Sequence, residues 1–364
     1  MRFSGFDDEW KTYKLKDLLH NKSSSISINQ LDDNVGNYPL YGASGFLKCI
    51  DFYEMDSDYI SIVKDGSGVG NISFHEKNTS VVNTSQYILP KENLNIHFIF
   101  YLLQTINLNK YKTGSTIPHI YFKDYSIEKV KIPKYDEQKK IGILLKNLDA
   151  KIEILDNKLQ MCQNFKKYLM QQIFTQKLRF NFNDTWKTVK IKDIFDERSE
   201  KGFLDLELLS VTLNDGVIKR SEIESKDNSN ENKSNYKHVL PGDIVYNSMR
   251  MWQGASGVSP YEGIVSPAYT ILIPKNVYSK YFGYYFKTNE MVYQFKKYSQ
   301  GLTSDTWNLK YPLISEIKIK IPSIEEQKEI TNVFEIMDEK IKILQNNIDE
   351  LTTFKKGLLQ QMFV

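Results

Sequence analysis

The chain has 364 residues, of which 41% are hydrophobic and 26% are charged, and its formal net charge is +3. This length exceeds one ordinary domain, and the composition is that of a globular chain with ample core material. The nearly balanced charge excludes a strongly basic or acidic protein, although the 48 lysines and arginines could still gather on one face.

The sequence holds little that points to metal, redox or membrane chemistry. Cys49 and Cys162 lack C-x-x-C spacing and predict neither a disulfide framework nor a metal site. The five histidines, at positions 20, 75, 97, 119 and 238, form no ligand pattern. No signal peptide opens the chain, and the longest apolar run, Phe98–Leu103, is far too short to span a bilayer. We therefore expect a cytoplasmic protein with no membrane partner.

The part of the chain before Pro133 differs strongly from its counterpart in the second half and is here called the first variable region; the second lies between the two long helical segments. The first variable region alternates short strand-like runs with turn signals. Tyr59–Val63 and Asn71–Phe74 are predicted strands, and the glycines of Asp65–Gly68 predict a hairpin turn between them. Ile96–Thr105 is predicted to be helical, and Tyr38–Gly45 is predicted to be a turn-rich segment.

A long helical pattern follows. Pro133 cannot continue a helix backwards, and Asp136 and Glu137 complement the positive end of the helix dipole. Apolar residues then recur at alternating spacings of four and three, which is typical of a coiled coil. They are Ile141, Leu145, Leu148, Ile152, Leu155, Leu159, Cys162, Leu169 and Ile173.

The second variable region again mixes strands and turns. Strands are predicted at Leu208–Leu213, Asp243–Tyr246 and Ala268–Ile273, and a polar loop is predicted at Ser225–Asn235. We expect α+β folds with mixed sheets in both variable regions.

The chain then ends on a second copy of the long helix. Each residue lies 189 positions after its counterpart without a gap, so that Pro322 matches Pro133. Ser323 and Glu326 predict a capping box in this copy. The second apolar series is Ile330, Phe334, Met337, Ile341, Leu344, Ile348, Leu351, Leu358 and Met362. Two equal series in one chain favour packing of the two helices against each other.

Each apolar series skips one turn of the helix. Lys166 and Lys355 fall at that level, and we expect the neighbouring Phe165 and Phe354 to cover it.

The repeat extends beyond the helices. The segment Arg2–Trp10 recurs as Arg179–Trp186, and weaker echoes pair Phe98 with Phe282 and Tyr101 with Tyr285. The end of the second copy corresponds to the point where the first copy leads into the second. A chain with this repeat is nearly a closed ring with two-fold symmetry that is open at one point. We therefore expect the N-terminus and the C-terminus to lie close together.

These patterns predict an α+β chain with a pseudo-two-fold internal repeat. Two mixed α/β domains are separated by two long helices that form an antiparallel intramolecular coiled coil. The predicted boundaries are residues 1–132 for the first domain, 133–176 for the central helix, 177–321 for the second domain and 322–364 for the C-terminal helix.

No catalytic constellation stands out. Gly66–Gly70 superficially resembles a phosphate-binding loop, but it lacks the P-loop lysine and leads into a strand. A DNA amino-methyltransferase would need adjacent prolines, and none of the ten prolines adjoins another. We therefore predict no catalytic residue and no metal ligand.

Matching loops in the two halves instead favour nucleic-acid recognition. Gly114-Ser115-Thr116 is echoed by Gly301-Leu302-Thr303, and both loops carry small hydrogen-bonding side chains. Arginine reads guanine, asparagine and glutamine read adenine, and lysine, serine and threonine hold phosphates. The predicted DNA-binding residues are Lys64, Ser67, Lys112, Thr113, Ser115, Thr116 and His119, and then Asn247, Arg250, Trp252, Gln253, Ser299, Gln300, Thr303 and Ser304.

The whole chain closely resembles the specificity subunit of type I restriction–modification systems. The motifs that carry the resemblance occur in order along both halves. They are Y-P-L-Y-G-A-S-G (Tyr38–Gly45), G-S-T-I-P-H (Gly114–His119), I-P-x-x-x-E-Q in both helix starts, Q-Q-I-F-T-Q-K-L-R-F (Gln171–Phe180), L-P-G-D-I-V-Y-N-S-M-R-M-W-Q-G-A (Leu240–Ala255) and Y-E-G-I-V-S-P-A-Y (Tyr261–Tyr269).

The resemblance implies a role without catalysis. Each domain would read one half of a split, asymmetric site in double-stranded DNA, and the helices would fix the gap. Two adenine methyltransferase subunits would dock on the helices, and restriction subunits could join them. S-adenosylmethionine, ATP and Mg would bind to those partners and not to this chain. The predicted partner-binding residues are Gln138, Asp149, Lys151, Gln327, Asp338 and Lys340.

A different class of function fits the same composition. A coiled-coil scaffold could present two protein-binding heads without DNA specificity, and the 23 tyrosines suit such interfaces equally well. Sequence-specific DNA binding that requires methyltransferase subunits would distinguish the two.

Overall fold

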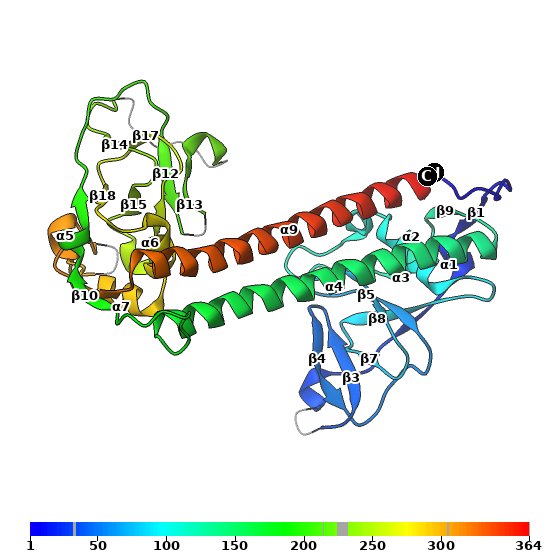
Figure 1. Cartoon of the computed structure of the whole chain (residues 1–364). Helices are drawn as coiled ribbons and strands as arrows, with labels where there is room; N and C mark the ends of the chain where they lie inside the picture. The colour runs from blue at the N-terminus through cyan, green and yellow to red at the C-terminus, as the bar shows by residue number, and fades with distance from the viewer. Residues whose placement is uncertain (32–33, 214, 224–231, 304–305, 364) are drawn as a thin grey trace. The chain divides into compact units, whose positions relative to one another are not determined.

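A computed structural model describes residues 1–31, 34–213, 215–223, 232–303 and 306–363. Its contacts divide the chain into two compact units, which can be followed by colour along the chain in Figure 1. Unit 1 contains Met1–Asn157 and Leu344–Val364, and unit 2 contains Lys158–Ile343. Each unit therefore combines one α/β domain with part of each long helix.

Unit 1 is built on a four-stranded antiparallel sheet in the order β2-β8-β5-β6. All five residues of the inner strand β5 are buried, as expected for a strand that is covered on both faces. The predicted hairpin is confirmed, because β5 and β6 pair with Ile60 opposite Phe74. The strands are β2 (Leu19–Ser23), β8 (Ser85–Pro90), β5 (Tyr59–Val63) and β6 (Ile72–His75).

Two smaller sheets complete unit 1. β3 pairs with β4 and β7, and β1 pairs with β9. The segment predicted to be turn-rich is therefore mostly strand, because only Ala43 and Ser44 are needed to turn between β3 and β4. The strands are β1 (Lys11–Lys14), β3 (Tyr38–Gly42), β4 (Gly45–Ile50), β7 (Ser80–Val81) and β9 (Lys129–Ile132). The short helices are α1 (Leu15–Leu18), η1 (Ile28–Gln30), α2 (Ile96–Gln104), η2 (Leu108–Tyr111) and α3 (Phe122–Tyr125).

His75, at the end of β6, should make unit 1 sensitive to acid. Its buried ring stacks on Tyr59, and its Nε2 lies 2.8 Å from Ser61 Oγ. Burial lowers the pKa of His75 from 6.5 to about 4, so the unfolded chain takes up a proton that the folded state rejects. Stability is therefore full above the unfolded pKa and falls as pH drops toward 4, by about 2 kcal/mol at pH 5.

Urea unfolding at about pH 7.5 and about pH 5 tests this expectation. The wild-type chain should lose more unfolding free energy on acidification than His75→Gln, which has no titrating ring. Equal losses in the two proteins would contradict it.

Unit 2 repeats the central sheet in the order β11-β18-β15-β16, again antiparallel. Equivalent strands keep their register, since Ile60 of β5 faces Ile88 of β8 and Ile244 of β15 faces Leu272 of β18. The predicted strands correspond to β12, β15 and β18, and residues 225–231 of the predicted polar loop lie outside the described residues. The sheet consists of β11 (Phe195–Glu197), β18 (Tyr269–Pro274), β15 (Ile244–Asn247) and β16 (Ser256–Val258).

Among the described residues of unit 2, the remaining strands form three antiparallel pairs. They are β10 (Lys187–Lys190) with β19 (Lys318–Ile321), β12 (Leu209–Thr212) with β13 (Gly216–Lys219), and β14 (Lys237–Val239) with β17 (Gly263–Val265). The short helices are α5 (Ile191–Ile194), η3 (Arg220–Glu222), η4 (Met251–Gln253), α6 (Ser279–Tyr285), α7 (Asn289–Tyr298) and α8 (Tyr311–Ile314).

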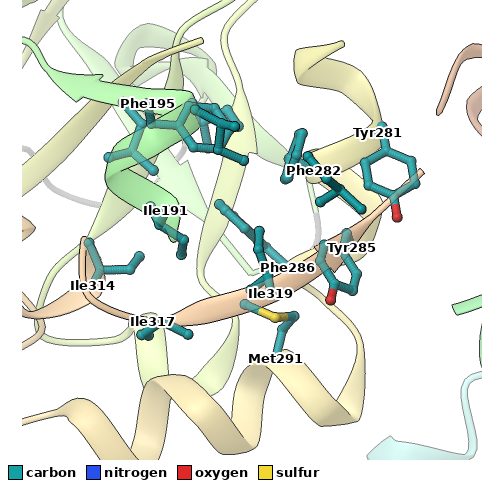
Figure 2. Packing of buried hydrophobic residues seen from close by; sticks show 14 of the residues in the cluster. Ile191, Phe195, Tyr281, Phe282, Tyr285, Phe286, Met291, Ile314, Ile317 and Ile319 are labelled. Atoms are coloured by element: carbon teal, nitrogen blue, oxygen red, sulfur yellow. The ribbon is translucent and has the colours of Figure 1, made fainter. Parts of the chain in front are cut away.

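Aromatic and aliphatic side chains pack together in the core of unit 2 (Figure 2). Phe195 of β11 packs against Phe282 and Phe286, with ring centroids 4.9 and 6.2 Å apart. Phe282 lies in α6 and Phe286 follows it directly, so this core fixes α6 beside the sheet. Such ring pairs add about 1 kcal/mol each to the burial of apolar area.

The two long helices are α4 (Tyr135–Phe174) and α9 (Ile324–Met362). In unit 1, Ile141 near the start of α4 shares a core with Met362 at the end of α9. In unit 2, Ile173 near the end of α4 shares a core with Ile330 near the start of α9. The helices are therefore antiparallel in both units, and every predicted apolar position of both series is buried or half-buried. Within the described residues, no helix combines the length and apolar character needed to cross a membrane.

The two ends of the chain meet in unit 1. The amino group of Met1 donates a hydrogen bond of 2.6 Å to the carbonyl oxygen of Gln361. The predicted closeness of the chain ends is confirmed.

The repeated arginines hold the starts of the long helices. Arg2 donates two hydrogen bonds, of 2.9 and 2.7 Å, to the buried carboxylate of Glu137. Arg179 binds the equivalent Glu326 at 3.1 and 2.7 Å. Only half of the predicted capping box forms, because Glu326 N donates to Ser323 Oγ at 3.4 Å while the Glu326 carboxylate is taken by Arg179.

The expectation for the skipped turn of each apolar series is wrong. Phe165 and Phe354 are 55% and 54% exposed, so neither covers that level. The side chains of Lys166 and Lys355 are only 19% and 17% exposed and lie between the helices themselves. A lysine can occupy such a level when its ammonium group finds a partner there.

The predicted echoes between α2 and α6 are wrong by one residue. Asn95 N donates to Gln138 Oε1 and Tyr278 N donates to Gln327 Oε1, both at 2.9 Å, just before α2 and α6 begin. Counting from these residues pairs Tyr101 with Tyr284 and not with Tyr285.

Candidate nucleic-acid interface

In unit 1 the turn after β5 lies beside residues 112–120. Ile120 N donates to Lys64 O and Gly66 N donates to Pro118 O, both at 2.9 Å. Thr113 and His119 exchange backbone hydrogen bonds of 2.9 and 2.8 Å, which close the segment between them into a short loop. The structure therefore brings together all seven residues predicted for unit 1, from Lys64 to His119.

The loop presents small polar side chains to solvent. Ser67, Lys112, Ser115 and Thr116 are exposed, and Lys64 is half-buried. Gly114 has a φ of +87°, and a side chain there would lie 2.5 Å from the carbonyl oxygen of Ile117. Only glycine fits this turn, which holds the serine and threonine outward.

The base of the loop is held by charge. Lys110 and Tyr111 both bind the Glu128 carboxylate. The hydrogen bond from Lys110, joined by that from Tyr111, holds the pKa of the Glu128 carboxyl below its ordinary value. The carboxylate therefore stays ionised and anchors the loop across the physiological pH range.

Unit 2 contains the same backbone arrangement with different side chains. Leu309 N donates to Ser248 O at 2.9 Å, as Ile120 N does to Lys64 O. Gln300 and Asn308 exchange backbone hydrogen bonds of 3.0 and 2.8 Å and close the second loop.

Aromatic rings stiffen the second loop. Trp252 and Trp307 pack edge to face with ring centroids 5.3 Å apart, and Trp252 Nε1 donates to Met249 O at 3.0 Å. Lys296 Nζ lies 5.5 Å from the centre of the Trp307 ring, a cation–π contact. This places a positive charge next to the loop.

The predicted residues of unit 2 differ in how accessible they are. Arg250, Gln253, Gln300 and Thr303 are exposed and available to a ligand. Trp252, described above, is half-buried. Two further side chains are engaged internally, since Asn247 Oδ1 accepts from Met249 N at 3.0 Å and Ser299 Oγ donates to Phe295 O at 2.7 Å. Ser304 lies outside the described residues.

Two apolar loop residues were missed by the sequence-based prediction. Ile117 is 65% exposed and Leu302 is 101% exposed, and each belongs to one of the two loops. Apolar side chains at such positions can contact the methyl group of thymine. Both stand within the motifs that singled out the loops, but the search for hydrogen-bonding side chains passed over them.

The predicted partner-binding residues are largely used inside the chain. Gln138 is 2% exposed and Gln327 is 1% exposed, and each donates from its Nε2 to the carbonyl oxygen of the preceding proline, Pro133 or Pro322. Each also accepts the backbone hydrogen bond that precedes α2 or α6. These glutamines fasten the helix starts to the domains.

The other four predicted partner-binding residues lie further along the long helices. Asp149 and Asp338 bind tyrosines and lysines of the same unit. Lys151 and Lys340 are exposed, so binding of a partner by these two stays a prediction.

Gln327→Ala is expected to destabilise unit 2. The substitution leaves the half-buried Tyr278 N and the buried Pro322 O without their partner, which should cost about 2–3 kcal/mol of unfolding free energy. Urea unfolding measures the change, and Lys340→Ala on the exposed face of the same helix should shift it by less than about 0.5 kcal/mol. A loss below about 1 kcal/mol in Gln327→Ala would show that water replaces the amide.

Comparison with known proteins points to one family. A family model described as the type I restriction modification DNA specificity domain matches residues 7–162 and 183–353. The chain is 23% identical over 398 residues to the type I restriction enzyme MjaVIII specificity subunit of Methanocaldococcus jannaschii, across 97% of this chain and 91% of that protein.

Two solved structures share the fold. The type I restriction-modification system S subunit from M. genitalium matches with a TM-score of 0.70 and 16% identity, over 100% of this chain and 97% of that one. A chain from a structure of a type I R-M system matches with a TM-score of 0.53 and 13% identity, over 99% and 98%. The paired domains and long helices described above are thus an architecture seen in S subunits.

Proposed function

The chain belongs to the type I restriction modification DNA specificity family, and from this premise we propose how it reads its DNA site. It is a specificity subunit with two target-recognition domains, and sequence specificity for DNA is the function of the family. Under the proposal, the domain of unit 1 reads one half of a bipartite, asymmetric site and the domain of unit 2 reads the other half.

The duplicated loop scaffold carries this proposal. A reciprocal pair of backbone hydrogen bonds closes each loop, between Thr113 and His119 in unit 1 and between Gln300 and Asn308 in unit 2, yet the side chains of the two loops differ. A constant scaffold with different exposed donors and acceptors is what two readers of two different sequences require. Arg250, Gln253 and Gln300 suit base edges in unit 2, whereas Lys112, Ser115 and Thr116 suit phosphates in unit 1.

The long helices set the gap between the half-sites. Two readers joined by stiff helices must face groove segments whose separation follows the DNA helical repeat of about 34 Å. The exposed faces of α4 and α9, including Lys151 and Lys340, would dock the other subunits of the complex.

Methylation belongs to those partners in this proposal. Two adenine methyltransferase subunits would bind S-adenosylmethionine and flip the target base, and restriction subunits would use ATP and Mg. The chain itself is non-catalytic and binds no cofactor. The support is the absence from its sequence of the adjacent-proline motif that an amino-methyltransferase needs.

Single-molecule methylation sequencing of host DNA, with and without this gene, tests the proposal. A bipartite motif with methylated adenines that disappears with the gene is expected, and it would reveal both half-sites together. If methyltransferase subunits co-purify with the chain but the complex binds DNA without sequence preference, the chain is a scaffold and the proposal fails.

A further inference from the structure

Each apolar series between the long helices is interrupted by one charged cluster. In unit 1, Lys355 of α9 lies with its Nζ 2.6 Å from Asp149 Oδ1 of α4. Tyr101 of α2 donates its hydroxyl to Asp149 Oδ2 at 2.7 Å, and Lys355 Nζ lies 5.2 Å from the Tyr101 ring centre. We name Tyr101, Asp149 and Lys355 the first helix cluster.

Unit 2 contains the same cluster with the helices exchanged. Lys166 of α4 forms an ion pair with Asp338 of α9. Tyr284 of α6 donates its hydroxyl to Asp338 Oδ2 at 2.7 Å, and Lys166 Nζ lies 5.0 Å from the Tyr284 ring centre. We name Lys166, Tyr284 and Asp338 the second helix cluster. Since Lys355 and Asp338 follow Lys166 and Asp149 by the same 189 positions, the repeat has preserved both partners of the ion pair.

These clusters are expected to add little to the free energy of unfolding. The lysine side chains are 17% and 19% exposed, whereas the aspartates are 38% and 44% exposed. Ion pairs with one partner in solvent are worth little, and apolar residues of similar volume often replace such pairs without loss. A gain in stability therefore does not explain why a charged residue interrupts each apolar series.

What the clusters do supply is a single register. A purely apolar series allows one helix to slide past the other by a heptad, because the same kinds of contact form again. A lysine that must meet one aspartate on the opposite helix removes the alternatives, as polar residues do in other coiled coils.

The tyrosines extend this constraint to the recognition domains. Tyr101 and Tyr284 belong to the domain helices α2 and α6, and each donates to the same aspartate that holds the lysine. Burial and the neighbouring aspartate raise the pKa of both phenols, so they remain hydrogen-bond donors at any physiological pH. Each cluster thus joins α4, α9 and one domain at one point.

We propose that the two helix clusters determine the length of the gap between the half-sites. They do so by fixing the register of the two helices and the position along the helices at which each domain packs. This inference rests on the proposed function, because it requires a bipartite site. It assigns a specificity role to residues whose contacts, as described above, lie within the chain.

The test removes the charge but keeps the volume. Asp149 and Asp338 lose their ammonium partners in Lys166→Met with Lys355→Met, but both stay partly exposed to solvent and keep the hydrogen bonds from Tyr101 and Tyr284. The variant should therefore lose little stability and keep both half-site preferences. Its complex with methyltransferase subunits is assayed for binding to DNA targets whose gap varies around the native length. We expect the wild type to favour one gap, and the variant to lose about tenfold of its preference for that gap over neighbouring lengths.

Matched variants make the result specific. Lys167→Met with Lys356→Met removes the same charge from the adjacent exposed positions and should leave the gap preference unchanged. Exchanging the partners in both clusters (Asp149→Lys with Lys355→Asp, and Asp338→Lys with Lys166→Asp) restores each ion pair but places a lysine, which cannot accept a hydrogen bond, where each tyrosine donates. It should therefore recover part of the preference for a single gap. An unchanged gap preference in Lys166→Met with Lys355→Met would overturn the proposal.

A readout without DNA separates this inference from the proposed function. Spin labels at Glu153→Cys and Glu350→Cys, both exposed in unit 1, report the distance between α4 and α9 once Cys49 and Cys162 are replaced by serine. The distance distribution should broaden in the lysine-to-methionine variant. If no bipartite site exists, the proposed function fails whatever this distance shows, and an unbroadened distribution overturns the register role itself.

Discussion

Inserting seven residues after Asn157 and seven after Asn346 is expected to lengthen the permitted gap and to leave both half-site sequences unchanged. A heptad adds about 10 Å of helix, close to three base pairs of DNA at about 34 Å per turn. Counting eight residues forward from Asp149 and eight back from Lys355 brings Asn157 opposite Asn347 in unit 1, so the two insertions face each other. Both helix clusters stay intact, because neither insertion separates a lysine from its aspartate.

Gap-series binding measures the outcome. On the native target the variant should bind at least about tenfold more weakly, since one recognition domain no longer reaches its half-site. Affinity should return on targets whose gap is longer by up to about three base pairs, as far as the added rotation of the DNA permits. An insertion in α4 alone is the control, because it shifts the two apolar series out of step and should bind no target of the series well. A changed half-site sequence in the double insertion would rule out the spacer role.

The long helices could be predicted because their signals are local and occur twice. The 3.5-residue period, the prolines at the starts and the constant interval of 189 are visible without tertiary contacts. The lysines at the skipped turns were the exception. Each lysine pairs with an aspartate of the other long helix, and the tyrosine that joins them lies 48 or 54 residues before that aspartate. No local pattern therefore shows why Phe165 is exposed and Lys166 is half-buried.

Many residues of the candidate site could be named from the sequence, but which loops lie side by side could not be predicted. The sequence singled out Lys64 and His119 separately, but the backbone hydrogen bonds from Ile120 to Lys64 and from Gly66 to Pro118 are needed to place their two loops together. Gln138 shows how burial changes the interpretation of a repeated polar residue. A repeated polar residue on a long helix suggested a partner, and burial against Pro133 and Asn95 shows that its hydrogen bonds are spent within unit 1.

Arg250→Ala is expected to weaken binding of the half-site read by unit 2 by about 10- to 100-fold and to leave the preference for the other half-site unchanged. Arg250 is exposed at the entrance to η4, beside the Trp252–Trp307 pair that stiffens the loop. An arginine that contacts a guanine through two hydrogen bonds contributes about 1–3 kcal/mol of discrimination. Arg250→Lys keeps the charge but loses the fork of donors, so it should recover phosphate attraction without recovering base preference.

Competition binding of the assembled complex separates the possible roles of Arg250. Targets with single-base changes in each half-site, measured at two salt concentrations, distinguish base contact from phosphate contact. A base contact gives a loss confined to one position of one half-site, with the salt dependence nearly unchanged. A phosphate contact gives a uniform loss across sequences and a shallower salt slope by about one ion. Equal binding of every target by Arg250→Ala and the wild type would remove Arg250 from the interface and leave Gln253 and Gln300 as the exposed amides to test next.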